Sequence, residues 1–183
     1  MEAESHSPKI RATTIVAVRR DSVLALGGDG QVTVGDTVFK STSQKVRRMG
    51  DDKVLAGYAG AAADALALFE RLEVKLEEYS GNLQRACLEL VKDWRTDRMM
   101  RRLEAMLIVG DANDLLIVSG TGDLIRPDEE VVAIGSGGGY ALSAARMLLR
   151  HTEIPADEIC KTALKAASEI CVYTNDHITV EVL

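Results

Sequence analysis

Residues 13 to 30 read Thr-Thr-Ile-Val-Ala-Val-Arg-Arg-Asp-Ser-Val-Leu-Ala-Leu-Gly-Gly-Asp-Gly. Residues 13 to 19 are mostly β-branched or apolar, which favours a strand, and residues 20 to 22 offer a turn. A second strand is expected at 23 to 26, ending at the glycines around Asp29. The sequence therefore predicts an antiparallel hairpin at the start of the folded part of the chain.

The register of this hairpin would bring a carboxylate beside its first residue. In an antiparallel pair, residues equidistant from the turn lie opposite each other. With the turn centred on Asp21, Thr13 lies eight residues before it and Asp29 eight after it, so we expect Thr13 opposite Asp29. Each residue also has an ordinary structural explanation, because threonine is common in strands and aspartate in turns.

The rest of the sequence alternates blocks of strands with pairs of helices. This order differs from the strand–helix alternation of a parallel doubly wound sheet, and it predicts an α+β fold. In that fold, two mainly antiparallel sheets lie between two helix pairs. The expected elements are strands at 32 to 39, 53 to 59, 104 to 109, 114 to 119 and 131 to 134, helices at 61 to 79, 82 to 102, 140 to 151 and about 155 to 170, and a closing strand pair within 171 to 182.

The composition indicates one domain and excludes several classes of protein. The chain has 183 residues, 46% of them hydrophobic, and a formal net charge of −6. An acidic chain has no general attraction for nucleic acid or anionic membranes. No apolar run approaches the roughly 18 residues of a membrane span. The three cysteines have no short spacing, which argues against a disulfide framework or a zinc site and suits a reducing cytosol.

Residues 1 to 12 differ in character from the chain that follows. They are polar, contain Pro8 and lack the apolar segment of a secretory signal. We expect an unstructured leader that is removed, followed by a single domain over residues 13 to 183.

Lys45, Gly57 and Ser136 are candidates for chemistry beside Thr13. A lysine ammonium held near Asp29 would favour the deprotonated form of a nearby hydroxyl or amine, although Lys45 could equally belong to a charged edge strand. Gly57 could offer an unobstructed backbone N–H to an oxyanion, or serve only as a tight connection. Ser136 lies in a glycine-rich loop at 135 to 139, before a predicted helix.

The same loop has a second interpretation. A Gly-x-Gly at 135 to 137, after a strand and before a helix, is a weak form of a dinucleotide or phosphate loop. The third glycine of that fingerprint is replaced by Tyr140, and the order of elements differs from the dinucleotide-binding fold.

Six strings, spread in order over nearly all of residues 13 to 183, resemble the N-terminal-threonine peptidase family. Within it they are most similar to the bacterial proteasome-like peptidases that work with a separate ATPase. The strings are Thr13-Thr14-Ile15-Val16-Ala17-Val18-Arg19-Arg20, Gly28-Asp29-Gly30-Gln31-Val32, Lys45-Val46-Arg47-Arg48, Val54-Leu55-Ala56-Gly57, Lys92-Asp93-Trp94-Arg95-Thr96-Asp97-Arg98 and Ile134-Gly135-Ser136-Gly137-Gly138.

This resemblance implies an N-terminal-nucleophile hydrolase fold, a four-layer α/β/β/α sandwich. It implies hydrolysis of peptide bonds in unfolded proteins, inside a homododecamer of two stacked six-membered rings in the cytoplasm. Substrates would be delivered by a hexameric AAA+ ATPase, so ATP would be used by the partner and no organic cofactor by this chain. No nucleic acid or membrane partner is implied.

The family's catalytic positions map onto Thr13, Asp29, Lys45 and Ser136, with Gly57 in the oxyanion region. The resemblance also implies a sodium ion held by the backbone carbonyls of Ser168, Cys171 and Thr174. The chain departs from the family at residue 168, where glycine is common, and at Gly139, where proline is frequent.

The expected mechanism depends on the backbone nitrogen of Thr13. A free α-amine has a pKa of about 7.7–8.0, close to working pH, and could take the proton of the Thr13 hydroxyl. In the longer chain that nitrogen is an amide, so removal of residues 1 to 12 would create the base. Two alternatives remain: an inactive ring subunit of the same fold, which should have lost Thr13, Asp29 or Lys45, and a nucleotide-binding module.

Overall fold

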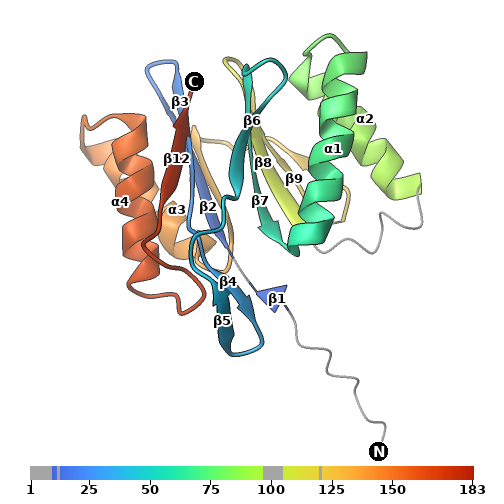
Figure 1. The fold of residues 1–183 in the computed structure, drawn as a ribbon. Coiled ribbons are helices and arrows are strands. Elements are labelled where there is room, and N and C mark those ends of the chain that lie inside the picture. The colour runs from blue at the N-terminus through green and yellow to red at the C-terminus, as the bar shows by residue number, and fades with distance from the viewer. Residues whose placement is uncertain (1–9, 12, 97–104, 120) are drawn as a thin grey trace, which may run out of the picture.

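The computed structural model describes residues 10, 11, 13–96, 105–119 and 121–183. Two sheets lie face to face, and a pair of helices covers the outer face of each (Figure 1). This arrangement confirms the predicted α+β sandwich of four layers.

The first sheet carries the N-terminal hairpin and has the strand order β11-β2-β3-β12, with every neighbouring pair antiparallel. Two helices, α3 and α4, cover its outer face through the alanine-rich cluster around Ala141, Ala163 and Leu164 (Figure 1). The bounds are β2 Thr14–Arg20, β3 Val23–Gly28, β11 Val131–Gly135, β12 Thr179–Val182, α3 Gly138–His151 and α4 Ala156–Ser168.

The second sheet has the order β10-β9-β8-β7-β6, again antiparallel throughout, so β6 is an edge strand. The helical hairpin of α1 and α2 covers it with a core that includes Phe69, Leu72 and Trp94. The bounds are β6 Val46–Met49, β7 Val54–Gly60, β8 Ala105–Gly110, β9 Leu115–Val118, β10 Leu124–Ile125, α1 Ala62–Glu78 and α2 Leu83–Thr96.

A small third sheet, in the order β1-β4-β5, corrects two expectations (Figure 1). The strand predicted at 32 to 39 is two strands, β4 Val32–Val34 and β5 Thr37–Lys40, because the chain turns at Gly35 with φ +58°. Within the leader, β1 Ile10–Arg11 pairs with β4, so these two residues are not unstructured. Residues 1–9 and 12 lie outside the described residues.

The hairpin of β2 and β3 shows that the predicted register was wrong by one residue. Its turn has two residues, Asp21 and Ser22, both in the left-handed region at φ +51° and +68°. A two-residue turn is centred between its residues, and the left-handed backbone matches the twist of the strands. Ile15 therefore pairs with Gly28, which continues to Thr14, and not Thr13, beside Asp29.

Two further boundaries differ from prediction. Helix α3 begins at Gly138, so Gly138 and Gly139 belong to the helix and not to the preceding loop. The segment 171 to 182 contributes one strand, β12, which pairs with β3 instead of closing on itself. The predicted residues 97 to 102, 104 and 120 lie outside the described part of the chain.

The inter-sheet core fixes the start of β2. Ile15 and Leu26 of the first sheet are fully buried against Leu55 and Ile108 of the second. Burial of such side chains contributes about 1.5–3 kcal/mol each. The residue before this anchored strand is Thr13, which is thereby held at the end of the sandwich. Among the described helices, none has the length and apolar character needed to cross a membrane.

Candidate active site

Thr13 is buried and has a strained backbone. It is 1% exposed and has φ +115°, a region that a β-branched residue rarely adopts. Within the described part of the chain, no hydrogen-bond partner reaches its Oγ1. Buried hydroxyls are nearly always paired, and unpaired or strained groups gather at functional sites. Thr13 therefore presents a hydroxyl that the fold itself does not use.

The carbonyl of Thr13 is fixed by the loop that follows β11. Ser136 N–H donates to Thr13 O at 2.9 Å. Gly135 has φ +92°, and a Cβ at this position would lie 1.9 Å from Thr13 O. Only glycine allows this approach. The predicted Thr13 and Ser136 are thus brought together, through the backbone of Ser136.

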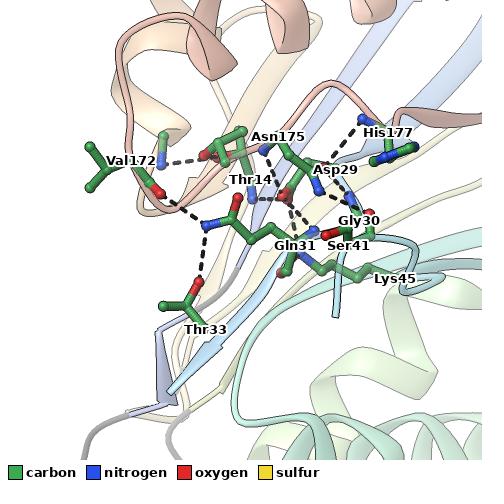
Figure 2. Close-up of polar contacts among 12 residues, drawn as sticks. Thr14, Asp29, Gly30, Gln31, Thr33, Ser41, Lys45, Val172, Asn175 and His177 are labelled. Atoms are coloured by element: carbon green, nitrogen blue, oxygen red, sulfur yellow. Dashed lines mark hydrogen bonds and ion pairs between the residues drawn. The ribbon is translucent and has the colours of Figure 1, made fainter. Parts of the chain in front are cut away.

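Asp29 and Lys45 form a buried ion pair that is bonded to Thr14, the residue after Thr13. Lys45 Nζ donates to Asp29 Oδ1 at 2.9 Å, and the two side chains are 1% and 0% exposed. Asp29 Oδ1 also accepts from Thr14 N–H at 2.7 Å, so the ion pair is attached to the residue next to Thr13 (Figure 2). On Oδ2, Asp29 accepts from Gln31 N–H at 2.9 Å and Asn175 N–H at 3.3 Å.

Burial has the larger effect on the charge of Lys45. Desolvation lowers the pKa of the Lys45 ammonium below its ordinary value, and the charge and hydrogen bond of Asp29 oppose this only in part. Lys45 Nζ donates a second bond, of 2.5 Å, to Gln31 O. The Lys45 ammonium therefore loses its proton more easily than the ammonium of a surface lysine does.

Thr14 connects this pair to the C-terminal segment. Its Oγ1 accepts from Gly137 N–H at 2.9 Å and shares a 2.7 Å bond with Thr174 Oγ1. All three groups are buried. No separate role for Thr14 could be predicted from the sequence, because a hydroxyl that alternates inward on a strand has no distinctive spacing.

The residues expected to hold sodium lie in one turn after α4. Ser168 ends the helix, Cys171 N–H donates to Ala167 O, and Thr174 N–H donates to Cys171 O at 3.0 Å. Ser168 lies in the last turn of α4, whose carbonyls have no partner within the helix, and neutral hard oxygens suit a monovalent cation. The Cys171 carbonyl accepts from Thr174 N–H and keeps a second lone pair that could face an ion. The donor chemistry therefore fits. The described residues contain no cluster of three His, Cys, Asp or Glu side chains suited to a metal.

Gly57 does not lie at the Thr13 end of its strand. A Cβ on Gly57 would meet Ile15 and Leu26 at 2.9 Å, within the inter-sheet core. Tyr58 N–H donates to Lys45 O on the β6 side, and successive residues of a strand direct their N–H groups to opposite neighbours. The Gly57 N–H consequently faces β8 and takes part in the sheet. The expectation of an oxyanion donor at Gly57 is therefore wrong.

Gly60, at the end of β7, is better placed. It has φ +123°, and by the same alternation its N–H faces the β6 side, beyond the start of β6. Its neighbour Ala59 lies beside the loop that follows β11 and contacts Thr13, because a Cβ on Gly135 would meet Ala59 Cβ at 3.2 Å. The sequence shows both glycines three residues apart, and only the strand register distinguishes them.

The loop at 135 to 139 is not free to bind a phosphate. Ser136 N–H is occupied by Thr13 O, and Gly137 N–H by Thr14 Oγ1. A phosphate loop needs such amides to face the ligand. These bonds remove the basis for a nucleotide-binding module.

A comparison with protein families agrees with this geometry. The model of the proteasome family, described as "Proteasome subunit", matches residues 10–183. The chain therefore belongs to the proteasome subunit family, and it has the N-terminal-nucleophile hydrolase fold that its resemblance implied.

Curated relatives and solved structures are more specific. "ATP-dependent protease subunit HslV" of Staphylococcus carnosus is 59% identical over 175 residues, 95% of this chain and 98% of the relative. The protein of the same name from Thermosipho africanus is 55% identical over 96% and 99% of the two chains. The crystal structure of eukaryotic HslV from Trypanosoma brucei has a TM-score of 0.88 and 46% identity, covering 93% and 98%.

These likenesses define the activity. The chain is the proteolytic subunit of an ATP-dependent protease of the HslV type, and it is a threonine-type peptidase. The expected active enzyme is thus confirmed in preference to an inactive ring subunit. A more distant structure, Thiobacillus denitrificans BPH, shares the fold alone, with a TM-score of 0.70 at 17% identity over 93% of this chain and 97% of that chain.

Proposed function

We propose that this chain cleaves peptide bonds of unfolded proteins with Thr13 as its N-terminal nucleophile, after residues 1 to 12 are removed. One observation carries the proposal: the buried, unpartnered Thr13 Oγ1 lies next in sequence to Thr14, whose N–H is bonded to the buried Asp29–Lys45 pair. No other threonine among the described residues has a buried hydroxyl without a partner.

The first step is attack by Thr13 Oγ1 on the substrate carbonyl. The freed α-amine of Thr13 takes the hydroxyl proton, directly or through water, and later gives it to the leaving amine. The acyl-enzyme on Thr13 is then hydrolysed by water. Lys45 tunes this proton transfer by its positive charge, Asp29 orients Lys45, and Ser136 holds the Thr13 backbone.

The negative charge that develops on the substrate oxygen needs a donor. We assign this role to the Gly60 N–H, which takes the place of the earlier candidate Gly57. Its support is the left-handed backbone of Gly60 at the end of β7, beside the Ala59–Gly135 contact. Loss of one such donor costs on the order of 10²–10³ in rate in other hydrolases.

The ATPase partner and the assembly of the enzyme are proposed from its relatives, and its compartment from its cysteines. We propose an HslU-type hexameric AAA+ ATPase as the partner that consumes ATP and delivers unfolded chains, and a homododecamer of two stacked hexameric rings. The name of the bacterial relatives, an ATP-dependent protease subunit, supports this. We place the enzyme in the cytosol, since Cys87, Cys160 and Cys171 are all free thiols.

Sodium is proposed at the carbonyls of Ser168, Cys171 and Thr174. When bound, the ion would supply a fixed positive charge to the turn after α4. Thr174 already contacts Thr14 through its hydroxyl, so the order of this turn affects the strand that carries Thr13. Omission of sodium, with potassium as the replacement, should alter the thermal transition of the protein if the site exists.

The proposed function is tested by mass spectrometry and substitution. The intact mass of the active protein should correspond to a chain beginning at Thr13, and a peptide epoxyketone should form its adduct there. Thr13→Ala should fold and assemble but show no peptidase activity with the ATPase partner, and Lys45→Ala should be severely impaired. Thr162→Ala, an exposed position on α4, is the control and should be active. An active enzyme that keeps residues 1 to 12 would overturn the proposal.

A further inference from the structure

Gln31 provides one of the two acceptors that hold the Lys45 ammonium. Lys45 Nζ donates to Asp29 Oδ1 at 2.9 Å and to Gln31 O at 2.5 Å. The carboxylate supplies charge, but the second acceptor is a main-chain carbonyl whose position depends on the conformation of the segment between β3 and β4. The direction of the lysine side chain thus depends on whatever fixes Gln31.

Gln31 is fixed at both ends. Its N–H donates to Asp29 Oδ2 at 2.9 Å, and its side chain is buried, with the residue 6% exposed. Its amide Nε2 donates to Thr33 Oγ1 at 3.0 Å and to Val172 O at 2.9 Å. An amide nitrogen has two donors, so both are satisfied. A side chain of the same size without donors would leave the Val172 carbonyl unpaired.

The bond to Val172 joins two segments that are far apart in the sequence. Val172 lies in the turn after α4, and its carbonyl faces Gln31 while its own side chain is 78% exposed (Figure 2). Two residues later, Thr174 contacts Thr14, the neighbour of Thr13. Gln31 therefore connects the lysine acceptor on one side of the site with the turn that supports the nucleophile strand on the other.

We infer that Gln31 is a positioning residue for catalysis: by anchoring to the Val172 carbonyl, it fixes its own carbonyl and so holds the Lys45 ammonium beside Asp29. The inference rests on the proposed role of Lys45. The catalytic residues predicted from the sequence do not include this glutamine.

The test compares Gln31→Met, which keeps the length of the side chain and removes both donors, with Gln31→Glu, which keeps the shape of the side chain but replaces the amide nitrogen and its two N–H donors with a carboxyl oxygen. The matched control is Gln84→Glu, on the exposed face of α2. Each variant is assayed in the complete complex with the ATPase, using a fluorogenic peptide over a range of pH. Circular dichroism and native mass spectrometry verify folding and assembly.

A displaced lysine should lower kcat and leave substrate binding nearly unchanged. We expect both Gln31 variants to lose about tenfold to a hundredfold in kcat, the effect of moving a catalytic group by about an ångström. Their KM should stay within about twofold, and Gln84→Glu should match the parent. In Gln31→Met, the fall of kcat at high pH should begin at lower pH, because an ammonium whose second acceptor, the carbonyl of residue 31, is displaced loses its proton more easily.

Two results would overturn the inference. One is a kcat of either folded variant within about twofold of the parent. The other is a loss of activity that is explained entirely by a smaller fraction of folded protein, together with a fall of kcat at high pH that begins at the same pH in Gln31→Met as in the parent. Lys45→Ala separates this failure from the failure of the proposed function: if that variant turns over normally, the role of Lys45 itself is wrong, whereas an inactive Lys45→Ala beside a normal Gln31→Met rejects only the role of Gln31.

Discussion

Thr14 and Asp29 exchange two hydrogen bonds across the start of the hairpin. Thr14 N–H donates to Asp29 Oδ1 at 2.7 Å, and Asp29 N–H donates to Thr14 O at 3.2 Å. The carboxylate that neutralises Lys45 is thus attached to the residue that follows Thr13, the proposed nucleophile. A shift of the strand that carries Thr13 would therefore also move this carboxylate.

Asp29→Asn should destabilise the protein strongly. The substitution leaves the Lys45 ammonium buried without its counter-charge, and breaking a buried pair from one side costs about 3–5 kcal/mol. Denaturant unfolding at neutral pH measures this loss. Asp123→Asn is the control, because Asp123 and its partner Arg95 are 54% and 61% exposed, and this change should have little effect. Equal stability of the two variants would contradict the role of Asp29.

Gly135→Ala should abolish peptidase activity. A methyl group at residue 135 would clash with Thr13 O, and the φ of +92° is itself unfavourable for alanine. Gly139→Ala is the matched control: nothing lies within 4 Å of its added Cβ, and alanine favours the helix α3. Turnover of a peptide substrate by the two folded variants distinguishes them. Full activity of Gly135→Ala would show that the Thr13 carbonyl can move freely.

Thr14→Val should lower both stability and kcat. Valine has the shape of threonine but leaves the buried Gly137 N–H without its acceptor, at a cost of about 1–3 kcal/mol. Thr14→Ser keeps the hydroxyl and should restore most of the loss, since the bonds to Gly137 and Thr174 can form again. Thermal unfolding together with kcat measures both effects. If the serine variant is as impaired as the valine variant, the methyl group matters and the hydroxyl does not.

Two buried thiols should make the free energy of unfolding decrease at alkaline pH. Burial raises the pKa of Cys87 and that of Cys160 from 9.0 to about 12. Between these values the unfolded chain releases thiol protons that the native chain keeps, so the free energy of unfolding falls as pH rises from 9 towards 12. The contribution is fully present below pH 9. The Cys87→Ala, Cys160→Ala double variant should lose stability with pH less steeply, by up to about 1.4 kcal/mol per pH unit for each thiol. If the stability of the parent and that of the double variant fall with pH at the same slope, the prediction is wrong.

The element order could be predicted from residue type and pattern. The β-branched run after Thr13 and the helical spacing of Leu68, Phe69, Leu72 and Trp94 indicate their elements directly, because burial selects apolar residues at those intervals. Asp29 could be proposed from the hairpin register, and Lys45 as a cation beside it, with support from the family resemblance. The structure pairs the two side chains, as a buried charge needs a partner.

Details set by backbone conformation could not be predicted. The left-handed pair Asp21-Ser22 shifts the hairpin register by one residue, and nothing in their composition distinguishes a two-residue turn from a three-residue one. Gly57 and Gly60 differ only in the direction of their N–H groups, which depends on pairing with β6 and β8. The side chains of Gln31 and Asn175 bind backbone atoms of segments more than 130 residues away, and such contacts leave no local spacing in the sequence.

The pairing of β1 with β4 would have a consequence for the enzyme if residues 1 to 12 are removed, as we propose. In the full chain β4 is the central strand of three, with Ile10 and Arg11 opposite Val34 and Thr33. Departure of the leader would turn β4 into an exposed margin with a row of vacant amides and carbonyls, a template on which another extended polypeptide can align. Before processing, residues 10 and 11 would thus cover the side of β4 that another polypeptide could bind afterwards. Successive residues of a strand direct their N–H groups to opposite neighbours, so one of the adjacent Thr33 and Val34 amides faces β1 and the other faces β5. The amide that faces β1 should exchange slowly in the full chain and fast after processing; unchanged protection of both amides would exclude this opening.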